Sequence, residues 1–198
     1  HFLIMNFKDI KTTLLPYAGI IRFMIILVVS HFVWKFTVLG EESGGQVTFF
    51  GCDISAPFVW MSEHIASVVY MFLQWFGYDV ERVGDTIVRF ANGNGARIVW
   101  SCTGIKQSYI FFCIILFSRG PWKHKLWFIP LGIVVCYVVN IIRITGLNMI
   151  IYNHREWFDF LHEHLFKYLF YGILFLLWMW WEEKFASLSR KKATEIES

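Results

Sequence analysis

The chain has 198 residues, of which 57% are hydrophobic and 20% aromatic, and its mean hydropathy is +0.51. These values exclude an ordinary water-soluble domain of this length and indicate an all-α polytopic membrane protein surrounded by membrane lipids. The formal net charge of +3 is small and lies mostly at the ends of apolar segments, which argues against binding to nucleic acid. No repeat or linker divides the sequence, so residues 1–198 are expected to form a single membrane domain.

Residues 17–39 form the first apolar segment and are long enough to cross about 30 Å of hydrocarbon. No small-residue cleavage site precedes this segment, so we expect it to remain as an anchor. Residues 36–81 then contain no Lys or Arg, which predicts that this region lies outside the cytoplasm.

Residues 56–76 have two interpretations. They are apolar enough for an additional span, but four polar side chains recur at helical spacing and form one stripe, namely Glu63, Ser67, Tyr70 and Gln74. The stripe favours an amphipathic interfacial helix at the outer membrane surface over a crossing.

A hairpin signal follows in "TIVRFANGNGARIVWSC", residues 86–102. Two β-prone runs flank Asn-Gly-Asn-Gly, which predicts a small β-hairpin that delivers Cys102 to the start of the next helix.

Three further spans are predicted at residues 102–118, 125–152 and 164–181, giving about four transmembrane helices with the first one. The connection at 119–125 and the tail at 182–198 are rich in Lys and Arg, and both are therefore expected in the cytoplasm. The opposite ends of these helices then meet at one outer surface.

Cys102 lies at the outer end of its helix, with Ser101 or Thr103 as the expected helix cap. The helix dipole and Lys106, one turn later, favour a thiolate at this position. A small buried cysteine is the alternative interpretation. The four cysteines show neither a C-x-x-C pair nor metal-ligand spacing, so we expect no redox motif, no metal site and no cofactor.

Arg143 lies inside an apolar run, about 13 Å from its outer end at 1.5 Å per residue. An arginine at that depth is costly in lipid, so it is expected to face a polar cavity or a partner. Asn140, one turn earlier, extends the same polar face, and a snorkelling or structural arginine is the alternative interpretation. The functional interpretation is a fixed cation that binds a substrate carboxylate or a developing oxyanion.

His162 and His164 lie at the outer end of the last predicted span. They are about 200° apart on a helix, so only one of them can point at a given site. Periodicity does not decide between them as a candidate general base.

The order of these motifs resembles that of the exosortase/archaeosortase family of membrane transpeptidases. The motifs are "SCTGIKQ", "NIIRI" and "DFLHEHLFKYLFYGILFLLW", and the resemblance covers residues 100–181. It implies that Cys102 is the nucleophile and that Arg143 and a histidine complete the site. His162 is preferred over His164 because short family members carry a histidine four residues before a Phe, here Phe166.

The resemblance also implies the substrates, which are exported proteins with a C-terminal sorting signal that is cut outside the membrane. Asn140 and Lys106 are then expected to contact substrate. The predicted location is the cytoplasmic (inner) membrane, with a multi-pass chain whose active site faces the non-cytoplasmic side. This chain has fewer spans than the best-known members, so the resemblance implies the chemistry more firmly than the substrate.

Two alternatives belong to other functional classes. One is a non-enzymatic membrane partner in polysaccharide or protein export, for which Cys102→Ser would be silent. The other is a thiol oxidoreductase, which a disulfide between Cys52 and Cys102 would support.

Overall fold

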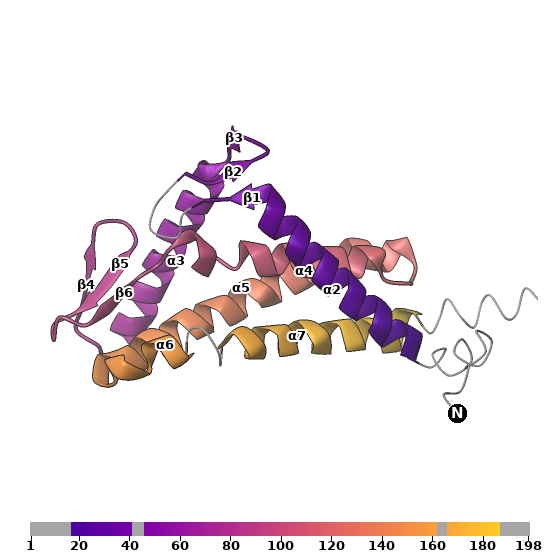
Figure 1. Cartoon of the computed structure of the whole chain (residues 1–198). Coiled ribbons are helices and arrows are strands. Elements are labelled where there is room, and N and C mark those ends of the chain that lie inside the picture. Colours follow the sequence, from indigo (N-terminus) through magenta and orange to yellow (C-terminus); the bar gives the residue numbers. More distant parts are fainter. Residues whose placement is uncertain (1–16, 41–45, 162–165, 187–198) are drawn as a thin grey trace, which may run out of the picture.

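The structure, a computed structural model, describes residues 17–40, 46–161 and 166–186. The long helices are α2 (Ala18–Thr37), α3 (Ser55–Trp75), α4 (Ile105–Phe117), α5 (Trp122–Asn153) and α7 (Phe166–Trp181), as shown in Figure 1. A 3-10 turn and the short helix α6 (Phe158–Phe160) follow α5, and a π-helical turn follows α7. The described part of the chain is therefore mostly helical, as the composition predicts.

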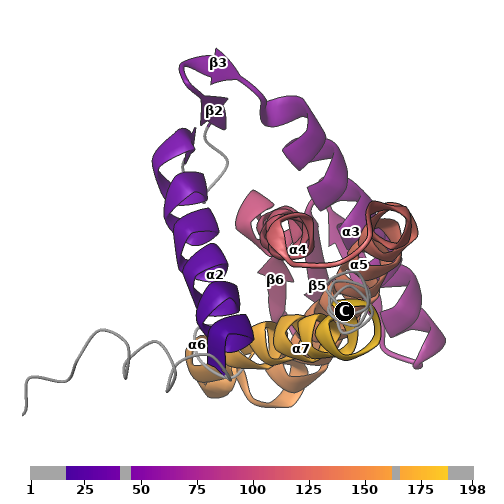
Figure 2. The ribbon, with the colours of Figure 1, turned by 90° about the vertical axis from the view of Figure 1, so that its right-hand side faces the viewer.

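Helix α4 lies at the centre of the helical layer. In Figure 2 it is seen nearly end-on, with α2 on one side and with α3 and α5 on the other. It contacts α2, α5 and α7, and it runs antiparallel to α5 across a short turn. The helix that follows Cys102 is thus held by neighbours on several sides.

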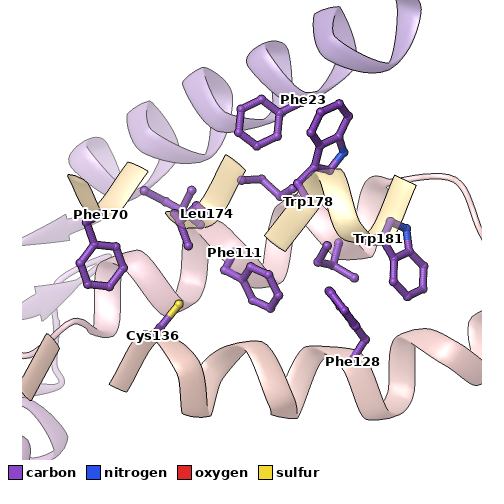
Figure 3. Packing of buried hydrophobic residues seen from close by; sticks show 11 residues of the cluster. Phe23, Phe111, Phe128, Cys136, Phe170, Leu174, Trp178 and Trp181 are labelled. Atoms are coloured by element: carbon purple, nitrogen blue, oxygen red, sulfur yellow. The ribbon is translucent and has the colours of Figure 1, made fainter. Parts of the chain in front are cut away.

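The main apolar core lies between α2, α4, α5 and α7 (Figure 3). Large aromatic side chains fill it, and its central members include Phe23, Phe111, Phe128, Trp178 and Trp181. Close packing requires a glycine here, because a Cβ on Gly132 of α5 would lie 2.0 Å from the ring of Phe111. Cys136 is fully buried in this core, as expected for a structural thiol.

Helices α2, α3 and α5 are each long and apolar enough to cross a membrane. Helix α4 is apolar but has only 13 residues, or about 20 Å, and it begins three residues later than the predicted span at 102–118. Helices α2 and α5 begin and end within a few residues of 17–39 and 125–152, the segments for which spans are predicted. Helix α7 covers most of the predicted 164–181, and α3 corresponds to the segment at 56–76.

Two small antiparallel sheets accompany α3. The first consists of β1 (Val38–Leu39), β2 (Thr48–Phe49) and β3 (Cys52–Asp53) and joins α2 to α3. The second contains the predicted hairpin, with β5 (Ile87–Phe90) paired to β6 (Gly95–Arg97). It also contains β4 (Val80–Val83), which was not predicted. Arg82 of β4 donates a hydrogen bond to Ser67 of α3 at 2.9 Å, so the sheet binds the polar stripe of that helix.

The turn between α4 and α5 has its polar groups satisfied within the protein. The ammonium group of buried Lys125 donates hydrogen bonds of 2.7 Å to the carbonyls of Leu116 and Ser118. The indole of Trp181 donates a third to the carbonyl of Arg119 at 2.8 Å. These bonds occupy carbonyls that the end of α4 would otherwise leave without partners.

Candidate active site at Cys102

Cys102 ends a 3-10 turn, Trp100–Cys102, that links β6 to α4. The prediction that Ser101 or Thr103 caps the following helix is wrong, because the N-cap of α4 is Gly104. Thr103 instead donates its hydroxyl to the carbonyl of Trp100 at 2.6 Å, which closes the 3-10 turn. Cys102 is 9% exposed and packs against apolar side chains of α3 and α5.

Gly104 explains why the motif has a glycine two residues after the cysteine. Its φ of +77° lies in the left-handed region that favours glycine. A Cβ at this position would also lie 3.2 Å from the side-chain Cγ of Asn140. Both the backbone conformation and the close approach of α5 therefore require a residue without a side chain.

Asn140 ties α5 directly to the turn. Its amide Nδ2 donates a hydrogen bond to the carbonyl of Cys102 at 2.8 Å. Its Oδ1 is buried and makes no hydrogen bond within the described part of the chain. The residue predicted to contact substrate thus holds the nucleophile candidate in place and keeps one acceptor.

Arg143 reaches the same point from the next turn of α5. Its guanidinium lies within interaction range of the Cys102 side chain, so its positive charge acts on that thiol. The structure therefore brings together Cys102, Asn140 and Arg143, which are 38 and 41 positions apart in sequence. Because the guanidinium meets a thiol and a half-buried environment, Arg143 does not face lipid alone.

The second sheet is fastened to the end of α5. The loop of the hairpin places the side-chain amide of Asn92 2.8 Å from the carbonyl of Tyr152. The amide of Asn94 lies 3.3 Å from the carbonyls of Ile151 and Tyr152. The Asn-Gly-Asn-Gly sequence therefore makes the hairpin turn and also caps α5, so the strand that leads to Cys102 is fixed relative to Arg143.

Lys106 is a half-buried residue in the first turn of α4. It lines a cavity of about 390 Å³ together with Lys35 of α2 and Ser101, the residue before Cys102. The sequence indicates Lys106 because of its charge. It does not predict that Lys35 lines the same cavity, because that depends on how α2 packs against α4.

His162 and His164 lie outside the described residues, so the choice of base stays a prediction. A different histidine, His64, which the sequence did not single out, lies on α3 and contacts α5. The Nε2 of His64 lies 2.8 Å from the hydroxyl of Tyr137 on α5, and its ring stacks on Trp60 with centroids 5.5 Å apart. The sequence feature that could have indicated His64 is its position next to Glu63, in the polar part of α3.

No disulfide joins any of the four cysteines, all of which lie in the described part of the chain. The Cys52–Cys102 bond that would support an oxidoreductase is therefore not formed in this structure. Within the same described residues no group of His, Cys, Asp and Glu side chains is arranged to hold a metal ion.

A family model described as Transmembrane exosortase (Exosortase_EpsH) matches residues 46–184, which is more than half of the chain. The chain belongs to the transmembrane exosortase family. The matched region extends well before the 100–181 of the motif resemblance and includes α3, both sheets around it, and α4 to α7. Exosortases are membrane-embedded cysteine transpeptidases that act on exported proteins with C-terminal sorting signals.

No curated protein and no solved structure matches this exosortase at a significant level. The family and the apolar helices together make it a multi-pass membrane protein.

Proposed function

We propose that this exosortase cleaves C-terminal sorting signals of exported proteins through Cys102, Arg143 and a histidine, at the outer boundary of the cytoplasmic membrane. The observation that carries the proposal is the closeness of the Arg143 guanidinium to the side chain of Cys102, in a turn that Asn140 holds by a hydrogen bond to the Cys102 carbonyl. A cation held against a thiol favours the nucleophilic thiolate. The family membership supports the same chemistry.

The reaction begins with proton transfer from the Cys102 thiol to the histidine, His162 by preference and His164 as the alternative. The thiolate sulfur then attacks the carbonyl carbon of the scissile peptide bond, and the electron pair of the C=O bond moves to oxygen. Arg143 stabilises this oxyanion, or orients the carbonyl before attack.

Collapse of the tetrahedral intermediate breaks the C–N bond. The hydrophobic C-terminal fragment leaves as an amine and takes its proton from the histidinium, so an acyl-enzyme remains on Cys102. An acceptor amine, or water, then attacks the thioester and releases the sorted protein. The histidine accepts the proton of the incoming group.

Depth in the membrane supports the outer boundary as the place of cleavage. Asn140, which bonds to the Cys102 turn, follows Trp122 by 18 residues, or about 27 Å along α5. The hydrocarbon layer is about 30 Å thick. If the basic stretch at 119–125, which contains Trp122, lies at the cytoplasmic boundary, Cys102 lies close to the opposite one.

The test compares C-terminal peptides of membrane and secreted proteins in hosts that express the wild type, Cys102→Ala, Arg143→Ala or Cys52→Ala. Cys52 is exposed and makes the matched control for loss of a thiol. We expect Cys102→Ala to abolish trimmed products, Arg143→Ala to reduce them at least 100-fold, and Cys52→Ala to behave as the wild type.

Membrane abundance and thermal stability of each purified variant show whether it is folded. Turnover retained by folded Cys102→Ala would refute the proposed nucleophile, and a silent Cys102→Ser would favour the non-enzymatic export partner. Near-normal trimming by folded Arg143→Ala would remove the proposed role of that residue.

A further inference from the structure

Two side-chain oxygens near the Cys102 turn are buried acceptors that receive no hydrogen bond within the described part of the chain. They are Oδ1 of Asn140 and Oε1 of Gln107. Asn140 is 1% exposed, and its amide nitrogen already donates to the Cys102 carbonyl. A buried acceptor without a donor costs free energy, so the pair indicates a place that a ligand with N–H or O–H groups fills.

Gln107 lies on the side of α4 that faces α5. It follows Gly104, the residue that packs against Asn140, by three positions. It precedes Phe111, which packs against Gly132 of α5, by four positions. Residues three and four apart share a helix face, and the third residue after an N-cap directs its side chain back toward the cap. Both acceptors therefore border the same turn.

The neighbouring charge limits what the two acceptors can bind. The guanidinium of Arg143 lies one turn of α5 from Asn140 and close to the side chain of Cys102. An ammonium group would be repelled by this positive charge, whereas a neutral amine would not. A neutral primary amine also has two N–H groups, one for each acceptor, and its lone pair stays available for attack. The acceptors and the fixed cation thus fit R–NH2 better than its protonated form.

We propose that Asn140 Oδ1 and Gln107 Oε1 form the subsite for the reacting nitrogen, and that the second half-reaction takes a neutral primary amine. This inference rests on the proposed function, because it needs an acyl-enzyme on Cys102. In the first half-reaction, the nitrogen of the scissile bond donates one N–H to the pair. It has two N–H groups once the histidinium has protonated it and the C–N bond has broken. The pair therefore stabilises the departing amine more than the intact peptide.

The acceptor amine enters the same place, by microscopic reversibility. Its lone pair forms a C–N bond with the thioester carbon, and the electron pair of the C=O bond moves to oxygen. The nitrogen gives one proton to the histidine and keeps the other as the new amide N–H. When the C=O bond re-forms, the C–S bond breaks with its electron pair on sulfur, and the histidinium restores the Cys102 thiol. Water in the same place gives hydrolysis, so the partition between amine and water reports on the subsite.

Hydroxylamine is the probe for the acceptor, because it is a primary amine that stays mostly unprotonated at neutral pH. Membranes of the expressing host are incubated with it, and mass spectrometry measures the ratio of hydroxamate to carboxylate at the C-termini of trimmed proteins. Both products come from the acyl-enzyme, so the ratio does not depend on how fast the acyl-enzyme forms. N-methylhydroxylamine, which has one N–H fewer, is the second probe.

Gln107 is substituted rather than Asn140, because Asn140 also holds the Cys102 carbonyl. Gln107→Met removes the acceptor with little change of shape, and Gln107→Glu keeps an acceptor oxygen. Gln74→Met makes the same change at an exposed glutamine of α3 and is the matched control. We expect Gln107→Met to lower the ratio about fivefold with hydroxylamine and less than about twofold with N-methylhydroxylamine. Gln107→Glu and Gln74→Met should stay within about twofold of the wild type.

An unchanged ratio in Gln107→Met, in membranes where trimming depends on Cys102, would overturn the subsite alone. An equal fall with both probes would overturn it as well, because a distorted turn lowers both. Absence of Cys102-dependent trimming in the wild type would instead refute the proposed function, and the subsite with it. If Gln107→Met does not fold, the wild type must still prefer hydroxylamine to N-methylhydroxylamine about fivefold more than a thioester in water does. An equal preference would overturn the proposal.

Discussion

At the scale of single residues, Gly104 meets two constraints on the turn that contains Cys102. It adopts a φ of +77°, and its lack of a side chain leaves room for the side chain of Asn140 beside its Cα. An alanine here adopts a left-handed conformation at a cost of about 1–2 kcal/mol and displaces the amide that holds the Cys102 carbonyl. We expect Gly104→Ala to lower the free energy of unfolding by that amount and to reduce trimming strongly.

The control for this prediction is Gly146→Ala on α5. A Cβ at Gly146 meets nothing within 4 Å, and its φ is not positive. Alanine in a helix interior is about 0.5–1 kcal/mol more favourable than glycine, so this variant should be as stable as the wild type or slightly more stable. Denaturant unfolding in detergent measures both, and similar losses in the two variants would contradict the argument.

The sequence predicts that Arg143 faces a polar cavity or a partner, because an arginine inside an apolar helix is costly in lipid, and the family resemblance implies that it shares a site with Cys102. It does not predict the cap of α4. Thr103 and Ser101 are ordinary cap residues by type, and only the approach of Asn140 makes the following glycine the cap. His64 was missed for a similar reason, since its partner Tyr137 is 73 positions away.

At the scale of elements, the loop between β5 and β6 holds the C-terminal end of α5 by hydrogen bonds. We expect Asn92→Ala combined with Asn94→Ala to loosen β5 and β6, because it removes the hydrogen bonds to the carbonyls of Ile151 and Tyr152. Each lost hydrogen bond costs about 0.5–1.5 kcal/mol. The double variant should therefore show roughly tenfold faster amide hydrogen exchange in β5 and β6. Hydrogen exchange of the amides at 87–97, followed by mass spectrometry, is the measurement.

Asn153→Ala supplies the comparison, because Asn153 is an exposed asparagine at the same end of α5. It should leave exchange in the hairpin unchanged. Equal exchange in the wild type and the double variant would mean that the sheet is held by its apolar contacts alone.

The hairpin was predictable because Asn-Gly pairs are local signals, whereas the other strands were not. The strands β1, β2 and β3 have two residues each, too few for any alternation to be recognised. The strand β4 depends on its pairing with β5 and on the bond from Arg82 to Ser67. These are contacts between segments that no local pattern reports.

At the scale of the whole molecule, the second sheet bears on whether α3 crosses the membrane. Its strands pack along α3 and carry exposed charged side chains, among them Glu81, Arg82 and Arg89. Open sheet edges and exposed charges are not stable in hydrocarbon. We therefore expect α3 and its sheet to lie at the outer interface, as the polar stripe favours, although α3 is long enough to span.

Labelling with a membrane-impermeant maleimide tests this topology. Cys52 lies in the sheet before α3 and is exposed, and Glu81→Cys in a Cys52→Ser background places a thiol in the sheet after it. Both should react from the non-cytoplasmic side of intact cells. Labelling of the two thiols from opposite sides would show that α3 crosses. Lys123→Cys in the same Cys52→Ser background is the control for the cytoplasmic side.

The turn between α4 and α5, whose polar groups are satisfied within the protein, fixes the height of Cys102 relative to the other end of α4. Lys125 and Trp181 hold this turn, and the stretch of α5 from Trp122 to Asn140, whose amide bonds to the carbonyl of Cys102, is about 27 Å long. In a bilayer thicker than about 30 Å, a helix segment of this length would leave the Cys102 thiol inside the hydrocarbon layer. Hydrophobic mismatch would then reduce access of substrate to the thiol. The proposed cleavage would then depend on the distance of a peptide bond from the membrane surface as much as on its sequence. Membranes of different thickness would present different sets of substrates to Cys102.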